Sequence, residues 1–400
     1  MRIRHGLLIA GAALLPLALQ GSGSGSLTVA TAWVGDAVFT GGWPSGLIRA
    51  PSGELIGCSY DRHNAVKALG IWHYDPSSSR LVEDFRVPGA GHCQFSRDAA
   101  GEPAFITSIF GERPESVSLQ FWKRSASTGR FELAGSYEAP EPFTLWGDGV
   151  EKGSFGLRGS DVIAPIKATL QGTETAAFVL SSRDGGTIWQ RLEARTGDTR
   201  FRAANSAAID PNGAWLVGVQ AVANGAAILK STDGGATWSQ AYWNVQANKI
   251  LVKYAEGGKI LALEESGVDP EVSSELLVSE DGGATWLVRP IPRTFPRGSL
   301  AMWDLAYDPA LGTLAVTGAQ NPGEQAYGTF VSLDLGESWQ AVDAITGEQG
   351  LPAGSAPFAD AHGVALDSEG YVYTIGHSTL TGIQGSPAQL RRSIEPFRRR

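Results

Sequence analysis

A turn sequence of eight residues recurs four times between residues 182 and 339, at intervals of about fifty residues. Each copy has the form Ser-x-Asp-x-Gly-x-x-Trp and follows a short run of aliphatic residues. The copies begin at Ser182, Ser231, Ser279 and Ser332. Asp and Ser oxygens accept backbone N–H groups of a tight turn, Gly adopts positive φ, and Trp packs beneath, so each copy predicts a hairpin. A repeat of this length indicates stacked units that bury their apolar faces against one another.

A second periodic feature sets the number of units. A Gly-containing turn precedes an apolar, strand-like run seven times, at residues 51–53, 98–101, 158–159, 210–213, 256–258, 308–312 and 367–370. Two degenerate copies of the first motif, at 74–81 and 124–131, keep a polar turn between two strand-like runs but lack the Trp. The 51 glycines have no three-residue period, which excludes collagen. The pattern predicts seven four-stranded units in a ring.

The motif resembles the Asp-box (BNR) repeat of the sialidase-like superfamily, and its clear copies cover roughly residues 150–341. The resemblance implies an all-β propeller, and the seven turns predict that it is a single seven-bladed β-propeller over residues 27–395, whereas sialidases of this superfamily have six blades. The last unit lacks one strand, so we expect the strand-like run 27–34 to complete blade seven, because an open ring would leave an unpaired sheet edge. The five arginines of 391–400 favour a solvated, frayed end, with 396–400 a basic tail.

The N-terminus indicates export. Arg2, Arg4 and His5 precede an apolar run at 6–19 and a Gly/Ser stretch at 21–26, a pattern typical of a signal peptide. We therefore assign residues 1–26 to a signal peptide and linker, with an uncleaved anchor as the alternative. The apolar run is shorter than the about 20 residues of a membrane span. The expected location is periplasmic or secreted, without stable membrane insertion after signal removal.

Two cysteines and the net charge set further limits. Cys58 and Cys93 are too few for a disulfide scaffold, but the predicted strands place them on neighbouring blades. A disulfide and two buried free thiols both remain open. The net charge of −9 argues against a nucleic-acid partner, because phosphate binding needs a basic surface.

Some members of the superfamily that this sequence resembles are sialidases. Sialidase catalysis needs three arginines that hold the substrate carboxylate, a Tyr nucleophile assisted by a Glu, and an Asp that acts as acid and base. Residues 42–45, where the first arginine is expected, read Gly-Trp-Pro-Ser. At the ends of the second strands Arg62 follows Asp61, whereas the corresponding pairs at 219–220, 264–265 and 319–320 contain no arginine. The sequence therefore predicts a protein that is not a sialidase.

The propeller geometry sorts residues by face. In each blade the first strand begins, and the second strand ends, on the same face of the propeller. The Asp boxes join the third and fourth strands and therefore lie on the opposite face. We place ligand binding on the face without Asp boxes. Four histidines fall there on blades seven, one and two, as candidate general bases or metal ligands. These are His63, His92, His362 and His377, with Tyr60, Asp61 and Arg62 beside them; the candidate ligand-binding residues are Trp43, Glu151, Trp303, Asp304 and Asp360. A metal at the histidines is left open, and no other cofactor is expected.

Two functions remain open. One is a non-catalytic propeller that binds a glycan or an extracytoplasmic protein at the channel face. The other is a carbohydrate-active enzyme, either a glycoside hydrolase with two carboxyl groups about 5–9.5 Å apart or a polysaccharide lyase. Aromatic and polar residues on one face suit a saccharide in both cases.

Overall fold

The computed structural model describes residues 27–29, 33–39, 43–61, 68–78, 80–110, 117–138, 143–145, 153–170, 175–256, 258–266, 274–292, 300–320, 328–342, 358–378, 388–393 and 395–398. The predicted signal peptide and linker, residues 1–26, lie outside this set. In the described part of the chain no helix has the length and apolar character needed to cross a membrane.

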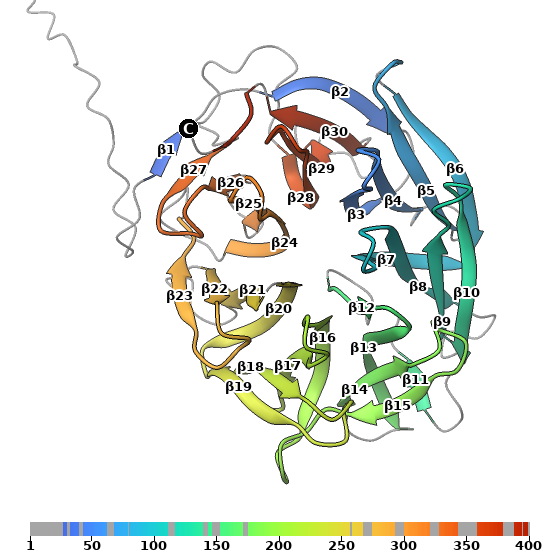
Figure 1. Ribbon diagram of the computed structural model, residues 1–400, viewed down its shortest axis with the longest axis vertical. Coiled ribbons are helices and arrows are strands. Elements are labelled where there is room, and N and C mark those ends of the chain that lie inside the picture. Colours follow the sequence, from blue (N-terminus) through green and yellow to red (C-terminus); the bar gives the residue numbers. More distant parts are fainter. Residues whose placement is uncertain are drawn as a thin grey trace, which may run out of the picture.

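Seven antiparallel sheets are arranged in a ring around a central axis (Figure 1), which confirms the predicted seven-bladed β-propeller. From the innermost strand outward, blade one contains β3 (Trp43–Arg49), β4 (Leu55–Asp61), β5 (Ala68–Asp75) and β6 (Arg80–Pro88), and blade two contains β7 (Ala90–Arg97), β8 (Pro103–Phe110), β9 (Val117–Arg124) and β10 (Phe131–Glu138). Blade three contains β11 (Phe143–Leu145) and β12 (Gly156–Arg158), which both pair with β13 (Asp161–Leu170), then β14 (Thr175–Ser182) and β15 (Gln190–Glu193).

The remaining blades follow the same order. Blade four contains β16 (Phe201–Ile209), β17 (Trp215–Ala221), β18 (Ala226–Ser231) and β19 (Ser239–Asn244), and blade five contains β20 (Ala247–Glu256), β21 (Lys259–Ser266), β22 (Glu275–Ser279) and β23 (Leu287–Pro290). Blade six contains β24 (Leu300–Asp308), β25 (Thr313–Gln320), β26 (Gly328–Ser332), β27 (Trp339–Ala341) and β1 (Leu27–Val29), and blade seven contains β28 (Phe358–Leu366), β29 (Val372–Ser378), β30 (Ala388–Ser393) and β2 (Trp33–Phe39).

An N-terminal strand closes the ring, as predicted, but the predicted residues were partly wrong. The closing strand is β2, which pairs antiparallel with β30 in blade seven. The earlier part of the predicted run, β1, instead pairs parallel with β27 in blade six. The N-terminal segment therefore contributes to two neighbouring blades, because the three residues between β1 and β2 separate two short strands that the sequence shows as one apolar run.

The apolar core is divided among the wedges between blades. Among the described residues, seven clusters of buried side chains each join two neighbouring blades. In the cluster between blades four and five, Leu216 and Ile228 pack against Ile250 and Ile260. Each blade is therefore buried against both neighbours, and the ring is stabilised by apolar burial at every wedge.

The Asp-box turns adopt the predicted geometry. In blade four the Ser231 hydroxyl accepts the Gly235 N–H at 2.8 Å, and Asp233 Oδ1 accepts the Thr237 N–H at 2.9 Å. Hydrogen bonds from the hydroxyl and N–H of Thr237 and the hydroxyl of Ser231 lower the pKa of Asp233 to about 2. In blade six Leu335 replaces the first glycine and adopts a φ of 57°. The four aspartates hold their own turns, as a structural role requires.

The placement of the Asp boxes opposite the predicted ligand face is also confirmed. The Asp-box residue Gly185 donates its N–H to the Ser160 carbonyl, and Gly282 donates to the Gly258 carbonyl. Both acceptors belong to the turn between the first and second strands of the same blade. The Asp boxes therefore lie on the face where the innermost strands end.

Cys58 of β4 and Cys93 of β7 form a disulfide with a Cα–Cα distance of 6.6 Å. Both cysteines are buried, with 0% and 1% exposure. The bond joins blade one to blade two, on the neighbouring strands that the sequence predicted.

The prediction of a solvated, frayed C-terminus was wrong in part, because Arg392 and Arg398 are exposed but Arg391 and Phe397 are buried. Arg391 is 2% exposed within β30, and Phe397 is 8% exposed in the cluster between blades six and seven. The Phe397 N–H donates to the Gly370 carbonyl, and its own carbonyl accepts the Thr313 hydroxyl at 2.8 Å. Apolar burial of Phe397 holds this basic segment on the fold despite its charge.

Candidate functional site

The innermost strands surround a central channel with a volume of about 820 Å³. Its lining comes from all seven blades, through β3, β7, β12, β16, β20, β24, β28 and the residues next to them. The innermost strands run in the same direction, so their first residues gather at one end of the channel, here called the bulge mouth. Their last residues and the following turns form the other end, here called the turn mouth. The volume lies within the range of small-molecule sites.

In most blades the pairing between the innermost and the second strand is interrupted, and these interruptions give the bulge mouth its name. In six blades the register between the innermost and the second strand shifts once or twice, which leaves residues of the innermost strand without a partner on the second strand. These residues are Ser45, Gly91–His92, Arg202 and Asn205, Asn248 and Lys253, Trp303, and Ala359 and His362. In blade three the innermost position is shared by β11, which pairs with residues 168–170 of β13, and β12, which pairs with residues 161–163. Bulges redirect side chains and are common beside functional sites.

Blades seven, one and two bring two histidines to this mouth. The Ser45 hydroxyl and His92 Nδ1 lie 3.0 Å apart, and the Tyr60 ring packs on the His92 ring with centroids 5.1 Å apart. His362 packs on Trp303, with ring centroids 4.7 Å apart. A Cβ on Gly363 would lie 2.8 Å from the Leu47 nitrogen, so blades seven and one approach closely here. Ser45 therefore lies between the blades that carry the two histidines.

An ion pair forms the polar wall of blades five and six. Lys253 Nζ lies 3.3 Å from Asp304 Oδ1 and donates to the Gly153 carbonyl of blade three at 3.0 Å. Asp304 Oδ2 accepts the Val364 N–H of blade seven at 3.1 Å. The two side chains are 7% and 19% exposed, so the charges are largely desolvated and compensate each other.

A separate carboxyl cluster lies on the same face, where blades four and five meet. Glu264, 2% exposed, is paired across β21 and β22 with Glu275, and the Asn244 amide of β19 donates to its Oε1. Burial, followed by the charge of Glu275, raises the pKa of Glu264 to about 7. Burial and the nearby Glu264 also raise the pKa of Tyr242. None of the residues of this cluster is among those that line the channel.

The structure brings together part of the predicted site. Tyr60, His92, Trp303, Asp304 and His362 lie at or beside the bulge mouth, as the contacts above show. For Trp43, Asp61, Asp360 and His377 the structure describes the backbone, within β3, β4, β28 and β29, but not the side chain. Arg62, His63 and Glu151 lie outside the described residues. The roles assigned to these residues stay predictions.

Sequence reasoning missed two residues at the bulges, Ser45 and Lys253, whereas it placed Asn205 on this face. A signal for Ser45 was present, because Ser45, Asn205 and His362 each precede their turn glycine (Gly53, Gly213 and Gly370) by eight residues. Lys253 gave no such signal, since its bulge lies closer to the turn of its blade.

The histidine cluster is tested only in part. Among the residues that the structure describes, no three His, Cys, Asp or Glu side chains are grouped so that they could hold a metal ion. Two of the four predicted histidine side chains, His63 and His377, lie outside that set.

A scan against protein-family models and a search of curated proteins found no match to this sequence. Solved structures do resemble it. A protein of unknown function from Dyadobacter fermentans is 14% identical, with a TM-score of 0.50 over 91% of this chain and 99% of that one. An α-L-arabinanase from Penicillium chrysogenum is 13% identical, with a TM-score of 0.49 over 90% and 98%. A sialidase from Trypanosoma rangeli is 10% identical, with a TM-score of 0.45 over 80% and 56%. At these identities the likeness establishes the fold alone.

Proposed function

We propose that this protein is an exported β-propeller that binds a saccharide at the bulge mouth. The observation that carries the proposal is the recurrence of bulges in six innermost strands, which places polar and aromatic side chains such as Ser45, Trp303 and His362 in the lining of the channel. The Cys58–Cys93 disulfide supports export, because disulfides form and persist in oxidising compartments.

The chemistry of the mouth suits a saccharide. Trp303, which lines the channel, supplies aromatic surface for the apolar face of a sugar ring. Ser45, Lys253 and Asp304 also line the channel and supply donors and acceptors for hydroxyl groups. Because Lys253 and Asp304 compensate each other, the proposed ligand is neutral rather than strongly anionic.

Binding is better supported than hydrolysis. Hydrolysis needs a second carboxyl group within about 5–9.5 Å of the first. Of the described side chains at this mouth, Asp304 supplies the carboxylate, and both of its oxygens already have partners. The hydrolase alternative depends on the side chains of Asp61, Glu151 and Asp360, which lie outside the described set, whereas binding rests on described contacts.

The experiment is a glycan array probed with the labelled protein and two tryptophan variants. Trp303→Ala is expected to lose retention on the glycans that bind the wild type. Trp243→Ala, which removes a Trp that is 40% exposed on the outer strand of blade four, is the matched control and should retain it. His362→Ala should weaken the same glycans. Absence of retained glycans, or equal retention by Trp303→Ala and the wild type, would exclude the proposal. Release of shorter products from a retained glycan would show that the protein is a carbohydrate-active enzyme, which is the alternative function.

A further inference from the structure

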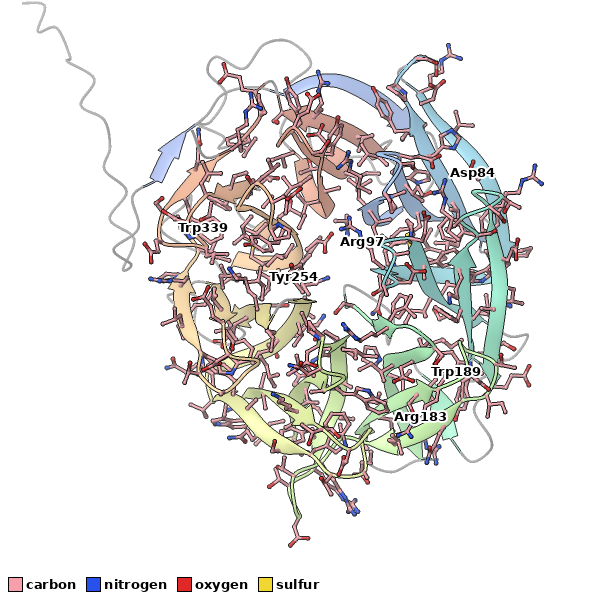
Figure 2. All side chains as sticks on the ribbon, viewed as in Figure 1. Asp84, Arg97, Arg183, Trp189, Tyr254 and Trp339 are labelled. Atoms are coloured by element: carbon pink, nitrogen blue, oxygen red, sulfur yellow. A yellow bond between two sulfur atoms is a disulfide. The ribbon has the colours of Figure 1, made fainter. Side chains whose placement is uncertain are left out.

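The turn mouth of the channel has a different character from the bulge mouth. Arg49, Arg97 and Arg158 are the last residues of the innermost strands of blades one, two and three, and all three line the channel. Tyr254 and Tyr307, from blades five and six, line it as well. Figure 2 shows Arg97 and Tyr254 at the inner ends of their blades, on opposite sides of the channel. One side of this mouth is therefore basic and the other aromatic.

The two tyrosines form a fixed surface. Their ring centroids are 5.1 Å apart at an interplanar angle of 86°, an edge-to-face arrangement. Lys259 Nζ lies 3.4 Å from the Tyr307 hydroxyl and 5.4 Å from its ring centroid. The lysine contacts the Tyr307 ring, and its charge is paired with Glu280, with 3.3 Å between Lys259 Nζ and Glu280 Oε1.

The acidic residues nearby are occupied by structural tasks. Glu54 and Glu102, which follow the turns of blades one and two, both pair with Arg124. Asp98 Oδ1 accepts the N–H groups of Ala100 and Glu102 at 2.9 Å. Asp308 Oδ1 accepts those of Ala310 and Leu311 at 2.8 and 3.1 Å. These carboxylates hold turns or pair with Arg124.

The three guanidinium groups therefore place positive charge on one side of the turn mouth, in a protein whose net charge is −9. Asp98 and Asp308 line the same end of the channel, and each binds N–H groups of its own turn, as Asp210 and Asp367 do in blades four and seven. A concave site with low-dielectric walls focuses such a potential and raises the local concentration of anions. A guanidinium fork matches the two oxygens of a carboxylate, and an aromatic wall suits an apolar body.

We propose that the turn mouth is a second ligand site, which binds a small organic carboxylate between the arginines of blades one to three and the tyrosines of blades five and six. The carboxylate pairs with the guanidinium groups, and the apolar part of the ligand packs on Tyr254 and Tyr307. The site shares none of the named residues with the saccharide site, and the two come closest in β20, where Lys253 of the bulge mouth and Tyr254 of the turn mouth are consecutive residues.

The test uses benzoate as the probe, because it has one carboxylate on an aromatic ring. Isothermal titration of the full chain at pH 7 and low salt should give a single site with a Kd near 1 mM. Benzamide, the neutral isostere, should bind at least tenfold more weakly. Raising the ionic strength from about 20 to 300 mM should weaken benzoate binding severalfold, because salt screens the charge attraction.

Substitutions locate the site. Arg97→Gln and Arg158→Gln change exposed side chains and should each weaken benzoate binding at least fivefold without changing the melting temperature. Arg130→Gln, an exposed arginine on the same face but outside the channel lining, is the matched control and should bind as the wild type does. Trp303→Ala should also bind benzoate normally, which separates this site from the saccharide site.

Three results would overturn the proposal. One is the absence of benzoate binding at 20 mM probe. Another is equal affinity of the Arg97→Gln and Arg158→Gln variants and the wild type. The third is binding of sulfate, but not benzoate, with the same dependence on the arginines, which would make the mouth a site for inorganic oxyanions instead.

Discussion

Lys253 of blade five and Asp304 of blade six form an ion pair across the bulge mouth, with a distance of 3.3 Å between Nζ and Oδ1. Through the Gly153 carbonyl and the Val364 N–H, the same two side chains also reach blades three and seven. Four of the seven blades are thus joined by one polar contact chain inside the channel.

Breaking this ion pair on one side should be costly. Lys253→Met leaves the largely buried Asp304 carboxylate without its counter-ion, and we expect the free energy of unfolding to fall by about 3 kcal/mol. The added change Asp304→Asn removes the uncompensated charge while keeping an acceptor for the Val364 N–H. Urea unfolding should therefore show the double variant recovering at least half of the loss. Equal stability of the single and double variants would show that the charge of Asp304 needs no compensation.

The disulfide should contribute measurably to the stability of the ring. Its cysteines are 35 residues apart, for which the loop-entropy model gives about 4 kcal/mol. We expect Cys58→Ala/Cys93→Ala to lower the free energy of unfolding by roughly 2–4 kcal/mol. A phosphine reductant during urea unfolding should bring the wild type to the midpoint of the double variant and leave the double variant unchanged. A wild-type midpoint that does not respond to reductant would argue against the bond.

The buried carboxyl of Glu264 should make stability depend on pH. Its pKa is raised from 4.5 to about 7 in the folded chain, so the folded state binds the proton more tightly than the unfolded state does. The contribution is fully present below pH 4.5 and is lost as the pH rises through 7. Glu264→Gln removes this loss, and we expect it to be more stable than the wild type at pH 8 by on the order of 2–3 kcal/mol.

The control for this prediction is Glu265→Gln, which changes the next residue, on the opposite face of the same strand. Thermal unfolding between pH 4.5 and 8 should show the pH dependence retained in Glu265→Gln and reduced in Glu264→Gln. A similar pH dependence in both variants would place its origin elsewhere.

Alanine substitutions at Gly213 and Gly235 should distinguish the cost of backbone strain from the cost of steric crowding. Gly213 and Gly235 have φ values of 83° and 86°, but a Cβ on Gly213 would meet nothing within 4 Å. A Cβ on Gly235 would lie 2.6 Å from Leu192 and 2.8 Å from Trp215. Gly213→Ala should therefore cost about 1–2 kcal/mol for the left-handed backbone. Gly235→Ala should cost a further 1–3 kcal/mol, roughly, for overpacking. Equal losses in chemical unfolding would mean that the Asp-box turn relaxes away from Trp215.

The local repeats in the sequence were sufficient to predict which face of the propeller carries the candidate site residues. The seven turns and four Asp boxes give the order of strands in each blade, and that order places His92, Trp303 and His362 on one face. The bulge at Lys253 could not be predicted, because this extra residue has the same local sequence character as a paired one. The Lys253–Asp304 contact depends on the closeness of two blades whose contacting residues are 51 positions apart.

Local chemistry by itself determined the blades of this protein: Gly and Asp fix each turn, and alternating apolar runs fix each strand. The tertiary structure decided which end of each strand meets which neighbour, and therefore where the chemistry gathers. It divided the N-terminal run between β1 and β2, since closure of blade seven needs the strand that reaches β30. It also buried Phe397 and so docked a basic tail that its composition would leave in solvent. Apolar burial between distant segments outweighs local preference at these positions, and no short stretch of sequence records it.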